Sequence, residues 1–172
     1  MNTKELFKLI SLLLQYPDGD ICQIDISDEI TDVKDKQIRK NLLEFEEYFK
    51  NTSQAQLQEQ YVETFDFNDE TNLFLTYSKL KDEKERGQVL VELKNMYAKE
   101  GLYLDNEELP DYLPLFLEFI SVANDEAALD LLHRFKGMIE HMHKKLLEDK
   151  SPYAYLMKAL LLEIDHFISK GN

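Results

Sequence analysis

Apolar residues recur at helical spacing along most of this chain, and few residues interrupt the pattern. The 172 residues include only five glycines and four prolines. No run of alternating apolar and polar residues lies between turn residues, so the sequence predicts no sheet. A chain of this length is large enough to bury one core. We therefore predict an all-α protein, a single-domain helical bundle of about six to seven helices that spans residues 1–172.

The predicted helices differ in how much of their surface is apolar. The first, from about residue 4 to residue 16, is apolar almost all round, which is typical of a helix at the centre of a fold. A long helix from about residue 27 to residue 50, and another that begins near Ser53, each carry a single apolar stripe. We expect these two helices to form walls of the bundle.

Residues typical of helix ends delimit the second half of the chain. Asp82 and Glu85 form a capping-box pattern that predicts the start of a helix. Gly101 is a typical residue for the end of that helix. Residues that favour N-caps predict three further helix starts: Asp111, with Pro114 in the first turn; Asn124 or Asp125; and Ser151, followed by Pro152.

Many of the acidic residues gather in two stretches that contain no Lys or Arg. Residues 51–78 hold five acids and residues 101–133 hold eight, of the 34 in the chain. The remaining acids nearly balance the 20 basic residues, so the net charge of −14 is local. Both stretches also carry many aromatic and aliphatic residues. This combination indicates docking of a partner that has an apolar face and positive charge.

Charge and cysteine content exclude several partners and compartments. A net charge of −14 is unsuited to nucleic acid or to an anionic membrane, since both bind clustered Lys and Arg. The single cysteine, Cys22, can form no internal disulfide, which indicates a reducing compartment. The apolar run at 9–14 is interrupted by Ser11 and lacks a signal-peptide cleavage site. We expect a cytoplasmic protein with no direct membrane insertion.

Two Glu-x-x-His motifs, Glu140 with His143 and Glu163 with His166, have the spacing of di-iron ligands. Such ligands must project into the interior of a bundle. At about 100° per residue, both motifs point largely away from the apolar stripes of their helices. No other motif indicates catalysis, so we predict no enzyme, no catalytic residue, no metal site and no cofactor. A di-iron metalloprotein is the alternative that these motifs leave open.

The segment ELPDYLPLFLEF at 108–119 is the main candidate for a partner-binding site. Glu107, Glu108 and Asp111 crowd like charges at one helix start, although a cap needs only one acid. We predict that these three residues supply charge to a docking site for a basic amphipathic segment. The apolar contacts that we predict beside them are Tyr77, Tyr112 and Phe116.

Several segments together resemble the nitrate reductase delta subunit family, of the NarJ type. They are LLLQYP at 12–17, YVETFDF at 61–67, LFLTYSKLKDEKERGQVLVELKNMY at 73–97 and ELPDYLPLFLEF at 108–119. The order and spacing of Tyr77, Arg86-Gly87 and Glu108-Leu109-Pro110-Asp111 are the most specific part of the match. We expect Arg86 to bind carboxylates inside the protein. The family is similar to the wider TorD-like redox-enzyme maturation chaperones, in which such an acidic helix-start motif is associated with partner recognition.

The resemblance implies an all-helical cytoplasmic chaperone that is absent from the finished enzyme. Its implied partner is the N-terminal segment of the nitrate reductase alpha (catalytic) subunit in the apo form. The chaperone would keep that subunit competent for insertion of the molybdenum cofactor and would prevent premature membrane attachment. An adaptor for another basic amphipathic client is the alternative, and both a monomer and a dimer are compatible with the sequence.

Overall fold

The computed structural model describes residues 1–80, 82–105 and 107–171. These residues form eight α-helices and no β-strand, which confirms the predicted all-α class with more helices than the six to seven expected. The helices are α1 (Thr3–Leu13), α2 (Ser27–Thr31), α3 (Lys36–Asn51), α4 (Gln54–Tyr61), α5 (Glu83–Lys99), α6 (Leu113–Val122), α7 (Asp125–Glu148) and α8 (Tyr153–Gly171). A 3-10 turn at Ile21–Gln23 and a π-helical turn at Val62–Asp66 are the other helical elements.

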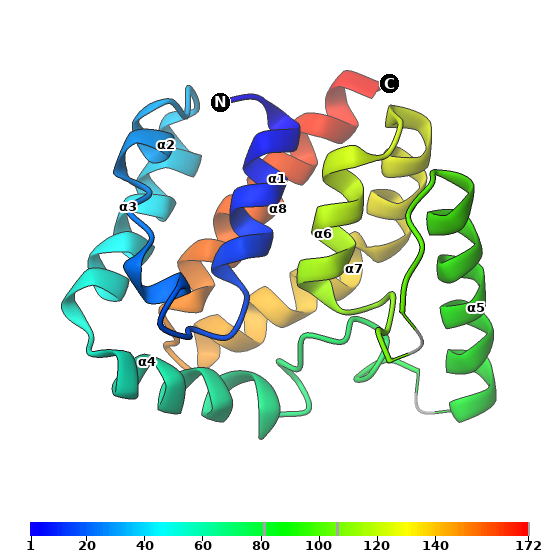
Figure 1. Ribbon diagram of the computed structural model, residues 1–172, viewed down its shortest axis with the longest axis horizontal. Helices are drawn as coiled ribbons and strands as arrows, with labels where there is room; N and C mark the ends of the chain where they lie inside the picture. The colour runs from blue at the N-terminus through cyan, green and yellow to red at the C-terminus, as the bar shows by residue number, and fades with distance from the viewer. Residues whose placement is uncertain (81, 106, 172) are drawn as a thin grey trace.

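The most apolar helices lie at the centre of the bundle, as predicted for the first helix. α1 packs on α6 and α8, and α8 also packs on α3 and α7. Phe7, Ile10, Phe116 and Leu160 are fully buried there, and burying each such side chain contributes roughly 1.5–3 kcal/mol. α4 crosses one end of the bundle, and α5 lies at the side away from α2 and α3 (Figure 1). No helix in the described part of the chain is long and apolar enough to span a membrane.

The predicted long helix from residue 27 to residue 50 is wrong, because the chain forms two helices, α2 and α3, in this region. Asp35 separates them in an extended conformation, and its side chain accepts hydrogen bonds from the N–H groups of Gln37 and Ile38. These bonds satisfy two of the free donors at the start of α3. The break also allows Ile30 and Val33 to enter the core.

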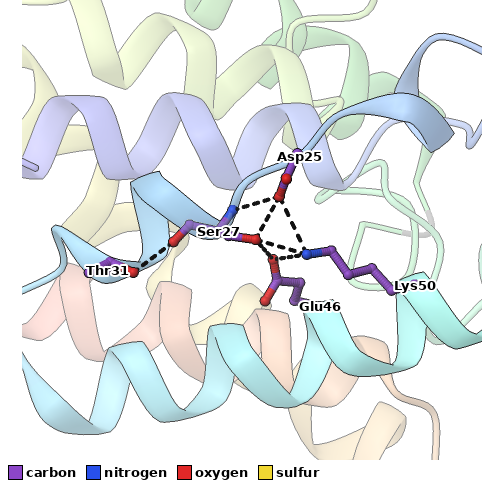
Figure 2. A network of polar contacts seen from close by, with 5 residues as sticks. All are labelled: Asp25, Ser27, Thr31, Glu46 and Lys50. Atoms are coloured by element: carbon purple, nitrogen blue, oxygen red, sulfur yellow. Dashed lines mark hydrogen bonds and ion pairs between the residues drawn. The ribbon is translucent and has the colours of Figure 1, made fainter.

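A polar network joins α2 to α3 on the outside of the bundle (Figure 2). Lys50 lies 2.9 Å from Glu46 and 3.3 Å from Asp25, and its ammonium donates to the Ser27 hydroxyl at 2.8 Å. The Ser27 hydroxyl oxygen lies 2.6 Å from the Asp25 carboxylate and 2.9 Å from the Glu46 carboxylate, so its single hydrogen is shared between them. Hydrogen bonds from the Ser27 side chain, its backbone N–H and Lys50 lower the pKa of Asp25 below its ordinary value. The network fixes α2, which is too short to be stable alone, against α3.

The helix that was predicted to begin near Ser53 ends before the last residue of its apolar stripe, Phe65. α4 ends at Tyr61, and the backbone continues as the π-helical turn, which is wider than an α-turn. Leu57, Tyr61 and Phe65 nevertheless remain on one buried face. The turn brings Tyr61 and Phe65 to a surface hollow that Phe74 and Tyr112 also line.

Candidate functional site

An isolated β-bridge between Phe74 and Tyr112 organises the site. The Leu75 N–H donates to the Asp111 carbonyl at 2.9 Å, and the Leu113 N–H donates to the Leu73 carbonyl at 2.8 Å. Directly opposed residues of an antiparallel pair point to the same side, so the rings of Phe74 and Tyr112 meet, with centroids 5.3 Å apart. Their neighbours point to the other side and are buried.

Asp111 is fully buried beneath this bridge. One carboxylate oxygen, Oδ2, accepts hydrogen bonds from the Thr76 hydroxyl (2.5 Å), the Thr76 N–H (3.2 Å) and Nη2 of Arg86 (3.3 Å). The other, Oδ1, has no hydrogen-bond partner among the described residues. The prediction that Arg86 binds a carboxylate internally is therefore confirmed. The prediction that Asp111 caps α6 is wrong, because Tyr112 occupies the N-cap position without a side-chain cap.

Two side chains of α5, Arg86 and Tyr97, hold the backbone of the bridge in place. Arg86 reaches Asp111 and also donates through Nε to the Thr76 hydroxyl at 3.0 Å. The Tyr97 hydroxyl donates to the Pro110 carbonyl at 2.8 Å, while its ring stacks on Phe119 with centroids 4.0 Å apart. α5 thus positions the chain on both sides of the bridge.

A surface pocket of about 380 Å³ lies outside the bridge. Its apolar lining comes from Phe74, Leu109, Tyr112, Pro114 and Leu115. Its polar lining comes from Gln15, Glu107, Glu108 and Glu118. Three glutamates therefore surround an apolar floor, and two of them, Glu107 and Glu108, are among the predicted site residues.

The pocket continues on both sides into further hollows. Gln15 and Glu118 also line a hollow of about 410 Å³ above α1, with Glu5, Lys8 and Leu12 among its walls. Phe74 and Tyr112 also line an aromatic hollow of about 320 Å³ beside Asp66. We refer to these three adjoining pockets together as the groove.

The charge of the groove is mostly unneutralised. Glu107, Glu108, Glu118 and Asp66 form no ion pair with any described residue, and all four are exposed. Lys8 is the one basic side chain among the described residues that line it. Carboxylates around low-dielectric walls produce a negative potential that attracts cations. An apolar segment that carries positive charge is the ligand chemistry that this surface suits.

The structure separates the predicted site residues into three groups. Glu107, Glu108 and Tyr112 line the groove. Asp111 and Phe116 are fully buried below it, and Phe116 packs on Phe135 in the core. Tyr77 is 45% exposed but lies outside the three pockets, with the Arg86 guanidinium 5.8 Å from its ring.

Sequence reasoning missed the part of the groove that comes from distant segments. Phe74, Leu115 and Glu118 lie in the stretches 51–78 and 101–133, which contain no Lys or Arg. The mixture of acidic and apolar residues in these stretches was the sequence signal that could have identified them. Leu12 lies in the last turn of α1 and Gln15 lies two residues beyond its end, and no local pattern marks them as part of a binding surface. Only the packing of α1 on α6 brings them to the site.

The two Glu-x-x-His motifs lie away from the groove. Glu140 is exposed and pairs with Lys136 at 3.5 Å. Glu163, in contrast, is only 7% exposed, so the prediction that its motif points outward is wrong for this residue. The chain start and Asp35 line a pocket together with Glu163 and His166 on that side of α8. Among the described residues, no group of three or more His, Cys, Asp or Glu side chains could hold a metal ion.

The fold and the groove define an all-α protein that carries an acidic, partly apolar groove on its surface. The chain belongs to the nitrate reductase delta subunit family, whose sequence profile matches residues 32–157. This match confirms the resemblance found in the sequence.

Three relatives illustrate the similarity. The chain is 37% identical over 172 aligned residues to the probable nitrate reductase molybdenum cofactor assembly chaperone NarJ of Bacillus subtilis (strain 168), covering 96% of this chain and 93% of that protein. It is 33% identical to the probable assembly chaperone NarW of Escherichia coli K12, covering 91% of this chain and 67% of that protein. Identity to NarJ of the same strain is 31%, over 89% of this chain and 66% of that protein. These relatives are named as chaperones and not as catalysts, in agreement with the prediction of a protein that is not an enzyme.

Proposed function

We propose that this protein is a chaperone for the assembly of a molybdenum nitrate reductase and that it binds the N-terminal segment of the apo alpha subunit. The observation that carries the proposal is the groove, in which an apolar floor lies among carboxylates without described ion-pair partners. The names of the relatives support the choice of client. The free thiol of Cys22 is in keeping with a cytoplasmic place of action.

Binding in this proposal has an electrostatic step and an apolar step. The carboxylates attract a basic segment from a distance and raise the rate of encounter. Burial of its apolar face on the floor then contributes roughly 25 cal/mol per Å² before the cost of ordering the segment. A helix is the conformation that best presents an apolar face and a basic face together.

The residues of the site have direct and indirect roles in this proposal. Glu107, Glu108 and Tyr112 contact the client segment, and Tyr77 lies on the neighbouring surface. Asp111 and Phe116 hold the floor from beneath, since both are fully buried. While the segment is bound, the alpha subunit is kept from membrane attachment until the molybdenum cofactor has been inserted.

The test is a calorimetric titration with a peptide of about the first fifteen residues of the same organism's nitrate reductase alpha subunit, at low and high salt. We expect saturable one-to-one binding that weakens as salt rises. The double variant Glu107→Gln/Glu108→Gln should weaken binding about three- to tenfold at low salt, since each exposed charge pair contributes roughly 0.2–1 kcal/mol.

The double variant Glu126→Gln/Asp130→Asn is the matched control, because it also removes two exposed acids of the same stretch, and neither lines the groove. It should leave the Kd nearly unchanged. Equal losses in Glu107→Gln/Glu108→Gln and in the control would mean that net charge, and not the groove, attracts the peptide. No binding to the wild-type protein at either salt concentration would overturn the choice of the N-terminal segment as client.

A further inference from the structure

The aromatic hollow at one end of the groove is lined mainly by aromatic side chains. Four of its rings come from residues far apart in the chain that meet only in the fold: Tyr16, Tyr61, Phe74 and Tyr112. Phe65 adds a fifth ring, and Asp66 supplies a carboxylate. The hollow has a volume of about 320 Å³.

The rings are fixed at steep angles to one another. Tyr16 meets Tyr61 at 88° with centroids 5.5 Å apart, and Tyr61 meets Phe65 at 64° and 4.9 Å. Tyr61 and Phe65 are buried, whereas Tyr16 is 45% exposed. The hollow therefore has a rigid aromatic floor and an accessible aromatic wall. Rings carry negative potential on their faces, so such a corner attracts a cation.

The hydroxyl groups in the hollow are oriented by one backbone carbonyl. The Tyr61 hydroxyl donates to the Leu14 carbonyl at 3.0 Å and lies 3.4 Å from the Tyr112 hydroxyl. Because the Tyr61 hydrogen is already used, the hydrogen between the two hydroxyls comes from Tyr112. The lone pairs of the Tyr112 oxygen remain available to accept a hydrogen bond from a ligand.

Asp66 adds negative charge that no described residue neutralises. It is exposed and lies in the stretch 51–78, which contains no Lys or Arg. Burial is the main cause of the raised pKa of both Tyr61 and Tyr112, and the charge of Asp66 raises both pKa values further. Asp66, Tyr61 and Tyr112 line the same hollow.

We propose that this hollow binds a guanidinium group, that of an arginine in the client segment. A guanidinium is planar and weakly hydrated, so it stacks on aromatic faces and can also donate a pair of hydrogen bonds to a carboxylate. A lysine ammonium is more strongly hydrated and cannot stack, so it suits the hollow less well. The source of the arginine rests on the proposed function, since Phe74 and Tyr112 join the hollow to the acidic pocket.

The first test uses small probes and does not require the client. N-acetyl-arginine amide, N-acetyl-lysine amide and the neutral N-acetyl-citrulline amide are titrated into the isotope-labelled protein and followed by NMR. We expect saturable shifts at Tyr16, Asp66 and Tyr112 with the arginine probe, about three- to tenfold weaker binding of the lysine probe, and no saturation with the citrulline probe. Equal binding of arginine and citrulline probes would overturn the assignment of a cation site.

Two variants and a control test the residues of the hollow. Asp66→Asn removes the charge and Tyr16→Leu removes an exposed ring. Each variant should bind the arginine probe about three- to tenfold more weakly than wild type. Asp69→Asn is the control, because Asp69 is an exposed acid of the same loop that does not line the hollow. An equal effect of Asp66→Asn and Asp69→Asn would overturn the site.

The same variants, titrated with the alpha-subunit peptide, separate this inference from the proposed function. Weaker peptide binding by Asp66→Asn than by Asp69→Asn supports both the cation site and the proposed function. If the peptide binds all variants equally and no probe shows saturable binding, the inference fails and the proposed function stands. If the arginine probe binds in the hollow but the peptide does not bind at all, the cation site stands and the proposed client fails.

Discussion

The carboxylate of Asp111 is buried, and among the described residues its one cationic partner is Arg86, whose side chain is 24% exposed. Removing one member of a buried ion pair leaves the other without its partner, and Thr76 also loses an acceptor. We predict that Asp111→Ala lowers the free energy of unfolding by about 2–4 kcal/mol. Urea denaturation measures this loss.

Arg86→Lys and Arg86→Ala are informative companions to Asp111→Ala. A lysine can reach either Asp111 or Thr76 but cannot bridge them as the guanidinium does. Arg86→Lys should therefore destabilise the fold less than Arg86→Ala. A loss below about 0.5 kcal/mol for Asp111→Ala, the size of an ordinary surface substitution, would show that the buried pair contributes nothing to stability.

Tyr112 and Phe116 lie one helical turn apart, and we predict that replacing Phe116 mainly lowers stability whereas replacing Tyr112 mainly weakens peptide binding. Phe116 is fully buried, so Phe116→Ala should cost about 3–5 kcal/mol of stability. Tyr112 lines the groove, so Tyr112→Leu should cost stability by about 1 kcal/mol and weaken peptide binding more than any control outside the groove. Thermal melting and calorimetric titration of both variants check this, the titration being carried out where each remains folded. Normal peptide binding by Tyr112→Leu would contradict its direct role.

The difference between Asp111 and its acidic neighbours explains what the sequence could and could not predict about the site. Local crowding of charge identified Glu107, Glu108 and Asp111 together. Only the fold distinguishes them, because Asp111 is buried by Thr76 and Arg86, which lie 35 and 25 residues away in sequence. Contacts at such separations leave no periodic pattern. Phe74 also lies in the groove because of a contact between distant parts of the chain, its β-bridge to Tyr112.

At the scale of helices, patterns local to one element were the reliable part of the prediction. Asp82 and Asn124 cap α5 and α7 as predicted, since each bonds to N–H groups within three residues. The break at Asp35 was missed, although Asp35 is itself a typical N-cap. The continuous polar pattern from residue 27 to residue 50 concealed it, because α2 and α3 are both exposed on one side. Tertiary contacts of Ile30 and Val33 decide where α2 turns into the core.

The network between α2 and α3 predicts a dependence of stability on pH. Hydrogen bonds from Ser27 and Lys50 lower the folded-state pKa of Asp25, so its ionised form stabilises the fold. This contribution is present above the unfolded pKa of about 3.9 and is lost as the pH falls through the lowered pKa. The Tm of wild type should therefore exceed that of Asp25→Asn at pH 7, and the difference between the two Tm values should decrease as the pH falls. Melting curves from pH 7 down to the lowest pH at which both proteins are folded test this, and a constant gap would contradict it.

At the scale of the whole molecule, excess negative charge acts on folding and on client binding in opposite directions. A net charge of −14 repels itself in the compact state, and salt screens that repulsion. The same salt screens the attraction between the acidic groove and a basic client segment. One set of charges therefore favours binding and opposes compactness.

We predict that raising sodium chloride from about 20 to about 300 mM, which shortens the screening length from roughly 20 to roughly 6 Å, stabilises the fold while it weakens the peptide complex. A gain of about 1 kcal/mol would raise the Tm by roughly 2–4 °C for a chain of this size. Calorimetric scans of the free protein give the dependence of Tm on salt. Titrations with the peptide at the same salt concentrations give the dependence of Kd on salt.

The variant Asp105→Asn/Glu126→Gln/Asp130→Asn lacks three acids that do not line the groove. Its Tm should depend less on salt than that of wild type, while the salt dependence of its peptide binding stays close to wild type. If both dependences fell together, the attraction would arise from the total charge of the molecule and not from the carboxylates of the groove.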